Sequence, residues 1–217
     1  MNYNFKEIFS ILEKESKKFI TPSVTEISNV NKSPYKTLIS CLISLRTKDA
    51  VTLQASKRLL SKAPTPNKMI KLKESEIASL IHPANYYLTK AKRIREISKV
   101  LIKKYKGKVP LEMDELLKLK GVGRKTANIV LVYGHNKEGL PIDVHCSRIP
   151  NRLGWIKTKN ANETEQVLRK ILPKQYWNKF NDLFVKFGQN ICVPVSPYCS
   201  KCPINKYCKK VDVKTSR

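Results

Sequence analysis

Acidic side chains are scarce in this chain, which has 17 Asp and Glu among 217 residues against 43 Lys and Arg. The formal net charge is therefore +26. A surplus of this size exceeds what solubility requires, although a lysine-rich proteome would explain part of it. The positive field favours a polyanionic partner, with nucleic acid ahead of an anionic membrane.

Long hydrophobic runs are also missing. The longest apolar stretch, residues 38–45, is interrupted by Ser40 and Ser44 and is far too short to cross a bilayer. The amino terminus, MNYNFKEIF, lacks the basic start, apolar run and small-residue site of a signal peptide. We therefore expect a cytoplasmic protein without a membrane partner, whose six cysteines are thiols or metal ligands rather than disulfides.

No segment shows the period-two alternation of a strand, so the predicted fold class is all-α. In the helix expected over residues 88–104, apolar residues at 91, 94, 97 and 101 form one face, and Lys90 is assigned with other basic residues to the rest. A loop is expected around residues 29–31. Apolar periodicity predicts helices over residues 3–19, 34–45, 50–60, 74–81, 88–104, 144–151, 162–172 and 176–187.

Several residues are placed to begin or end these helices. Ser33 before a proline, and Asp49 and Asp143, are candidate amino-terminal caps. The run from Asn162 to Glu165 resembles a capping box. Gly188 is expected to end the last, strongly aromatic helix, whose aromatic residues are interpreted as core.

The segment LLKLKGVGRKTANIVLVY, residues 116–133, predicts two helical runs joined by a tight turn at GVG. Glycine takes positive φ without steric cost, and the outward amides of such a turn can bind a phosphate oxygen. Lys125 lies in the first turn of the second run, where the positive end of the helix dipole favours a neutral, nucleophilic amine. Taken alone, the pattern also fits a helix C-cap followed by a basic, solvated face.

Four cysteines lie close together near the carboxyl end, separated by six, two and five residues: Cys192, Cys199, Cys202 and Cys208. This spacing predicts a metal site, and three prolines exclude regular helix between the ligands. Structural zinc usually has two C-x-x-C pairs, whereas a compact winding with one pair also fits a cubane iron–sulfur cluster, so both stay open. Cys41 and Cys146 are interpreted as buried small hydrophobes.

These motifs together resemble the endonuclease III family of DNA glycosylase/AP lyases. The resemblance rests on LKGVGRKTANIVL, on Asp143 eighteen residues after Lys125, and on the C-x6-C-x2-C-x5-C tail, and covers about residues 34–208. It implies two helical domains with a DNA-binding cleft between them. Residues 28–137 would form a six-helix domain with a helix-hairpin-helix motif at about 113–133. Residues 1–27 and 138–217 would form a four-helix domain whose cysteine loop, 192–208, carries a [4Fe-4S] cluster.

The resemblance implies base-excision repair of double-stranded DNA containing damaged pyrimidines or abasic sites. We expect this chain to act as a monomer associated with the nucleoid. The resemblance implies that Lys125 attacks the sugar C1′, expels the base and cuts the strand by β-elimination through a Schiff base. Asp143 would stabilise the cationic sugar and help move protons.

Further residues are expected to contact DNA. Arg46 occupies the position where many family members have a glutamine that fills the gap left by the extruded nucleotide, and we expect it to prefer an orphaned guanine. Tyr86 lies in the segment matching the family's wedge loop and could intercalate. His145 and Arg148 follow Asp143 closely. The backbone phosphates would meet the turn and the start of the next helix at Gly121, Val122, Gly123 and Arg124.

Three alternatives remain. A mismatch glycosylase acting on T or U opposite G normally lacks a lysine at this hairpin position. A non-catalytic DNA-binding protein would have no use for Lys125 paired with Asp143. A zinc-binding regulator would purify as a colourless protein.

Overall fold

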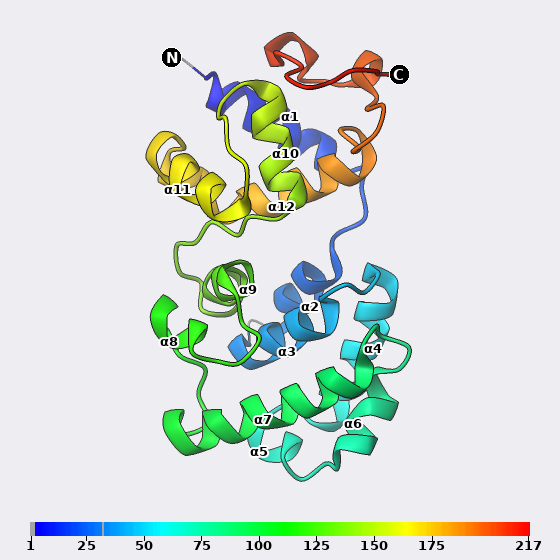
Figure 1. Cartoon of the computed structure of the whole chain (residues 1–217), viewed down its shortest axis with the longest axis vertical. Coiled ribbons are helices and arrows are strands. Elements are labelled where there is room, and N and C mark those ends of the chain that lie inside the picture. The colour runs from blue at the N-terminus through cyan, green and yellow to red at the C-terminus, as the bar shows by residue number, and fades with distance from the viewer. Residues whose placement is uncertain (1–2, 32) are drawn as a thin grey trace. The chain divides into compact units, whose positions relative to one another are not determined.

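The computed structural model describes residues 3–31 and 33–217, and these residues form helices and loops without any strand (Figure 1). The predicted all-α class is confirmed. None of the described helices combines the length and apolar character that crossing a bilayer requires. The α-helices are α1 Phe5–Ser16, α2 Ser23–Asn31, α3 Pro34–Ser44, α4 Asp49–Lys62, α5 Pro66–Met69, α6 Glu74–Ile81, α7 Tyr87–Tyr105, α8 Met113–Leu117, α9 Arg124–Ile129, α10 Val144–Leu153, α11 Ala161–Ile171 and α12 Trp177–Asn190.

The chain divides into two compact units, unit 1 being Met1–Pro22 with Leu140–Arg217 and unit 2 being Ser23–Gly139. Within the described residues, unit 1 holds four α-helices and unit 2 holds eight, of which α5 and α8 are single turns. The loop expected around residues 29–31 was wrong, because helix α2 continues to Asn31. Ile27 on this helix is buried in the core of unit 2. Ser23 also donates a hydrogen bond to Asp49 Oδ1 at 2.8 Å. Unit 2 therefore begins with α2, at Ser23.

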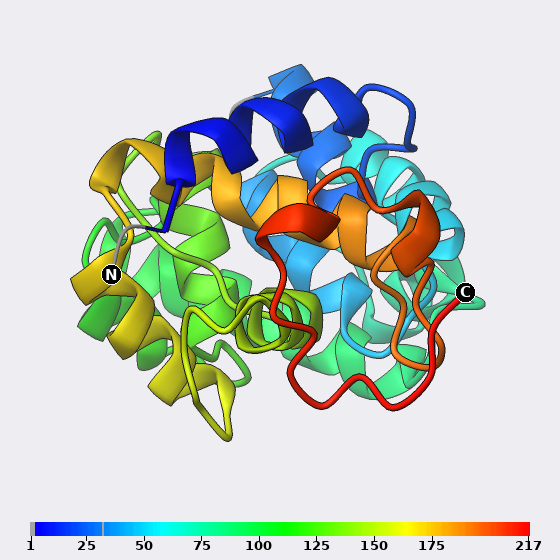
Figure 2. The ribbon, with the colours of Figure 1, turned by 90° about the horizontal axis from the view of Figure 1, so that it is seen from above.

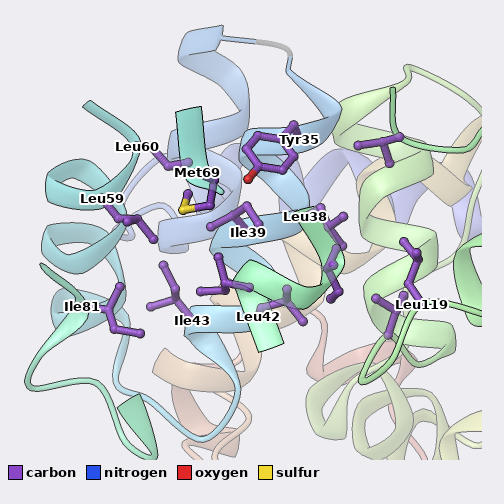
Figure 3. Close-up of a cluster of buried hydrophobic side chains, with 14 of the residues drawn as sticks. Tyr35, Leu38, Ile39, Leu42, Ile43, Leu59, Leu60, Met69, Ile81 and Leu119 are labelled. Carbon is purple, nitrogen blue, oxygen red and sulfur yellow. The ribbon is translucent and has the colours of Figure 1, made fainter. Parts of the chain in front are cut away.

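Unit 2 is built around α3, whose side chains are buried at Tyr35 and from Thr37 to Ile43. This even burial matches the nearly unbroken apolar sequence, since a helix that is hydrophobic all round lies in a core. Figure 3 shows Ile39 and Ile43 of α3 beside Leu59 and Ile81, with Leu119 on the other side of the helix. The Tyr35 hydroxyl is paired with Ser98 Oγ at 2.7 Å inside this core.

Unit 1 has an aromatic core to which both ends of the chain contribute. Helix α1 lies beside α12 (Figure 2), and Phe9 of α1 stacks on Tyr176 with ring centroids 4.2 Å apart. Phe180 and Phe184 of α12 stack at 4.0 Å. The predicted core role of these aromatic residues is confirmed. Cys146 is also buried here, as expected.

Two of the three helix caps predicted from single residues are present in the structure. Ser33 caps α3 by accepting from the Lys36 amide at 3.4 Å, and Asp143 caps α10, so both predictions are confirmed. The cap assigned to Asp49 was wrong, because Asp49 is the first residue of α4 and Lys48 is its N-cap. Its carboxylate instead accepts the hydrogen bond from Ser23.

Two other helix ends differ from prediction. Helix α11 begins at Ala161, because Asn160 is its N-cap and accepts from the Glu163 amide at 3.0 Å. Gly188 does not end the last helix, which continues to Asn190. Gly188 is buried inside α12 where His145 of α10 packs against it, so its missing side chain serves close packing rather than a turn.

Candidate active site

The glycine turn of unit 2 joins α8 to α9, and its two glycines differ. Gly121 has φ +83°, the left-handed region that favours glycine. Gly123 has φ −98° and ψ 176°, an extended conformation open to any residue, and is the N-cap of α9. The expectation of positive φ therefore holds for Gly121 alone. A Cβ on Gly123 would meet no atom within 4 Å, so the protein's own packing does not require glycine there.

Lys125 is the second residue of α9, and its side chain is exposed. Burial raises the pKa of the Cys41 thiol in α3 to about 12, and the positive charge of Lys125 acts against that rise. The charge of the Lys125 amine therefore acts on the Cys41 thiol of α3. The surface position leaves this amine accessible to a large substrate.

The chain beyond α9 departs from the expected helix, which was predicted to reach Tyr133. A π-helical turn, Val130–Gly134, follows Ile129. Gly134 packs so closely on the start of α3 that a Cβ there would stand 2.8 Å from the Cα of Pro34. The end of the hairpin's second helix is thus fixed against the central helix of unit 2. Such π turns are frequent at functional sites.

Asp143 begins α10 in unit 1. Its Oδ1 accepts hydrogen bonds from the amides of His145 and Cys146, each at 2.9 Å. These bonds fix the carboxylate at the positive end of the helix, where a negative charge is stabilised. The Asp143 side chain is partly exposed, so the carboxylate caps the helix and can still be reached by a substrate.

His145 and Arg148 lie on the same helix and are joined to the cysteine loop. Arg148 Nη2 lies 2.9 Å from His145 Nδ1 and donates to the Cys192 carbonyl at 2.7 Å and the Gly188 carbonyl at 3.1 Å. Burial lowers the pKa of Arg148. Because its donors are directed at protein carbonyls, Arg148 has a structural role, and its DNA contact stays a prediction.

Cys192, Cys199, Cys202 and Cys208 line one pocket in unit 1. Its other walls are mainly apolar and include Ile149, Leu153, Phe187 and Ile204. The sequence prediction that the four residues act as a set is consistent with this arrangement.

Polar contacts hold the cysteine loop from outside. Arg152 Nη1 donates to Cys192 Sγ at 3.3 Å and to the Val193 carbonyl at 2.7 Å. The Lys210 amide donates to Cys208 Sγ at 3.4 Å. Hydrogen bonds of this kind stabilise thiolate ligands and tune a bound cluster.

Four cysteines are a donor set that either zinc or an iron–sulfur cluster takes. No three His, Cys, Asp or Glu residues in the described part of the chain converge closely enough to hold a single metal ion. In a cubane cluster each cysteine binds a different iron, so the thiols stand further apart than around one zinc. Burial raises the pKa of the Cys202 thiol to about 12, so a cationic centre is needed to hold it as a thiolate.

Arg46 and Tyr86 lie on two loops of unit 2 that are hydrogen-bonded to each other. Both residues have left-handed backbones, with φ +55° and +57°, and both side chains are exposed. Asn85 donates from Nδ2 to the Arg46 carbonyl and from its amide to Thr47 Oγ1 at 3.2 Å. The structure therefore brings together two residues that the sequence analysis selected separately.

Lys90 was wrongly assigned to the solvated side of α7, since only 5% of its surface is exposed. It precedes the buried Ile94 by four residues, so its position on the apolar face could have been recognised. Its amine donates to the Ile43 carbonyl in the last turn of α3 at 2.6 Å and to the Leu45 carbonyl beside Arg46 at 2.7 Å.

The comparisons with known proteins support the same family that the sequence motifs resemble. Residues 39–174 match the family model described as HhH-GPD superfamily base excision DNA repair protein. The chain is 47% identical to endonuclease III of Thermotoga maritima over 81% of this chain and 83% of that protein. Among solved structures, a non-covalent endonuclease III–DNA complex matches with TM-score 0.81 and 31% identity, covering 97% of this chain and 96% of that one. A trapped endonuclease III–DNA covalent intermediate with an estranged adenine matches with TM-score 0.79 and 30% identity, covering 97% of each chain. The chain belongs to the HhH-GPD superfamily of base excision DNA repair proteins and, within it, to the endonuclease III family of DNA glycosylase/AP lyases.

Proposed function

We propose that this chain is a bifunctional DNA N-glycosylase that removes oxidised pyrimidines from duplex DNA and cleaves the resulting abasic site. The observation that carries the proposal is the exposed Lys125 in the first turn after the glycine turn. It is supported by the similarity to an endonuclease III caught as a covalent intermediate with DNA.

Chemistry begins with extrusion of the damaged nucleotide, because the sugar C1′ cannot be reached inside the stacked duplex. Lys125 Nζ attacks C1′, the C1′–N bond breaks, and the base leaves with a proton. The ring opens to an imine between Lys125 and C1′, which acidifies the C2′ proton. Loss of that proton breaks the C3′–O bond on the 3′ side, and hydrolysis of the imine regenerates the amine. A hydroxyl nucleophile could not form this imine.

Asp143 supplies a negative charge beside the sugar as positive charge develops on it. The two amide hydrogen bonds to Oδ1 keep its carboxylate oriented before substrate arrives. We propose that Lys125 and Asp143 act on the same extruded nucleotide, and that the chain has the domains expected from its sequence, 28–137 and 1–27 with 138–217.

Backbone phosphates are held by the glycine turn. The amides of Gly123 and Arg124 begin α9 and can donate to a phosphate oxygen, and the net charge of +26 attracts the duplex over a longer range. Val122 is buried and fixes the turn to its own unit. We expect His145 to approach the DNA near Asp143, and a monomer to act on nucleoid DNA in the cytoplasm.

The four-cysteine pocket is proposed to hold a [4Fe-4S] cluster on Cys192, Cys199, Cys202 and Cys208. When bound, the cluster supplies four iron–thiolate bonds that fix the loop against α10. Iron and sulfide analysis of the purified protein tests this assignment, with Cys202→Ser expected to lose the visible absorption. Stoichiometric zinc in a colourless protein would contradict it.

The decisive experiment for function is borohydride trapping on a duplex containing an oxidised pyrimidine. We expect a covalent protein–DNA adduct in the unmodified protein and none in Lys125→Ala, because the imine is the species that borohydride reduces. Lys99→Ala removes an exposed lysine elsewhere in unit 2 and should still be trapped. Base release without any adduct would instead indicate a monofunctional glycosylase of the mismatch type.

A further inference from the structure

Lys90 is a buried cation in unit 2 that the proposed chemistry does not use. It lies near the start of α7, and its Nζ is within hydrogen-bonding distance of three acceptors that follow one another along the chain. These are the Ile43 carbonyl at 2.6 Å, the Leu45 carbonyl at 2.7 Å and Thr47 Oγ1 at 2.8 Å. The amine therefore spans the carboxyl end of α3 and the turn that follows.

The charge of Lys90 suits this position. Carbonyls in the last turn of a helix have no intrahelical partner, and a cation there is stabilised by the helix dipole. Burial lowers the pKa of Lys90 to about 8, so the amine still carries three protons at neutral pH. Each of the three protons has an acceptor, one at the end of α3 and two in the turn that follows it.

The turn held by Lys90 carries Arg46 in a left-handed backbone conformation, φ +55°, that costs a non-glycine residue free energy. Asn85, next to Tyr86, donates to the Arg46 carbonyl and to Thr47 Oγ1. Thr47 Oγ1 is thus shared by Lys90 and the second loop. Lys90 connects the two loops that are expected to meet DNA.

The side chains that these loops present are exposed, while the Lys90 amine is buried at its bond to Ile43 and partly buried at its bonds to Leu45 and Thr47. Tyr86 is 64% exposed and Leu45 is 38% exposed. A methionine would fill the space under the turn equally well without the desolvation of a charge. A buried lysine at this point is explained by the need to hold an outward-facing turn in one conformation.

We propose that Lys90 is a positioning residue for lesion recognition, which fixes the 45–47 turn so that Arg46 meets the DNA in one orientation. The inference rests on the proposed function only where it assigns Arg46 a DNA contact. The rigidity of the turn is a property of the free protein and can be measured alone.

The first test is limited trypsin digestion of the DNA-free protein, with cleavage after Arg46 quantified by mass spectrometry. Lys90→Met should be cut at this bond about tenfold faster than the unmodified protein, because the turn opens locally without its amine. Lys99→Met, which removes an exposed lysine from the same helix, should leave the rate unchanged. Equal cleavage of all three proteins at Arg46 would overturn the proposal.

If Lys90→Met does not fold, Thr47→Val provides the second variant. It removes one of the three acceptors and the acceptor of the Asn85 amide, while Lys90 and the core remain. Faster cleavage after Arg46 in this variant supports the proposal. Protection equal to that of the unmodified protein overturns it.

The second test is a double-mutant cycle in the glycosylase reaction under single-turnover conditions. Lys90→Met and Arg46→Ala should each lower the rate of excision opposite guanine, and the double variant should be no slower than the slower single variant. Multiplicative losses would show that Lys90 does not act through Arg46 and would overturn the proposal. An unmodified protein that excises no oxidised pyrimidine would defeat the proposed function, while the trypsin test would still decide the role of Lys90.

Discussion

Gly188 lies so close to His145 that a Cβ atom on the glycine would stand 2.4 Å from His145 Nδ1. The contact brings α12 against α10 two residues after Asp143. Arg148 then links the same His145 ring to the Cys192 carbonyl. The candidate catalytic acid and the cysteine loop are therefore attached to one helix whose position depends on a missing side chain.

Gly188→Ala should destabilise the protein by about 1–3 kcal/mol, because the added methyl overlaps the His145 ring. The better helix propensity of alanine offsets about 0.5–1 kcal/mol of this. Denaturant unfolding measures the difference. The double variant with His145→Ala should recover part of the loss, since the ring is then absent. Equal loss with and without the ring would show that another contact limits the space.

Local features of the chain were predictable from sequence, and those that depend on distant partners were not. The caps at Ser33 and Asp143 were recognised because a cap is a contact within a few residues. Gly188 was misread because its burial depends on α10. The spacing of Lys90 to Ile94 indicated the apolar face of α7, but its acceptors at the end of α3 could not be read from the sequence. Glycine usually indicates a turn and lysine a solvated face, and tertiary packing overrides both tendencies.

The same distinction applies to the candidate site. The hairpin lysine, the acid and the cysteine set could be selected from residue type and spacing. The hydrogen bonds joining the Arg46 turn to Asn85 could not, because 39 residues separate the two in sequence. The structural role of Arg148 was also hidden, since its acceptor on Cys192 is 44 residues away.

Gly121→Ala and Gly123→Ala form a matched pair that separates folding from DNA binding. Gly121→Ala should lower the free energy of unfolding by about 1–3 kcal/mol, because alanine is strained at φ +83°. Its Cβ would also stand 2.6 Å from the flexible Arg93 side chain. Thermal or urea unfolding provides the measurement.

Gly123→Ala should leave stability nearly unchanged, because the added Cβ meets nothing within 4 Å and the backbone is extended. It should weaken binding to duplex DNA about tenfold, since a phosphate must approach the turn amides closely. Binding titrations at fixed ionic strength measure the loss. Unchanged affinity would show that the phosphate does not contact the turn at this glycine.

The stability contribution of Glu115 should depend on pH. Hydrogen bonds from Lys118, Tyr105 and Lys104 lower the pKa of this carboxyl group in α8 to about 2, from an ordinary value of 4.5. Because the folded-state pKa is the lower one, the stabilisation is fully present well above pH 4.5 and is lost as the pH falls towards 2.

Comparison with Glu115→Gln isolates this group, since the two proteins share every other titrating residue. Their difference in free energy of unfolding should be constant near neutral pH and should shrink as the pH falls below 4.5. Urea unfolding at a series of pH values measures it. A difference that stays constant down to pH 3 would show that these hydrogen bonds do not favour the ionised form.

Asp143→Asn should separate the capping role of Asp143 from its catalytic role. Asparagine caps helices about as well as aspartate, so α10 keeps its acceptor for the His145 and Cys146 amides and the melting temperature should change little. The negative charge is lost, and excision should slow by about 10²-fold or more, the usual range for a group that assists charge or proton movement.

Asp143→Ala should add a loss of about 1 kcal/mol in stability, because the cap is then gone. Asp114→Asn, which removes one exposed charge from α8, should change neither property. Single-turnover excision assays and thermal unfolding of the three variants provide the comparison. If Asp143→Asn retained nearly full activity while Asp143→Ala lost stability, Asp143 would be a helix cap and the catalytic acid would have to be sought elsewhere.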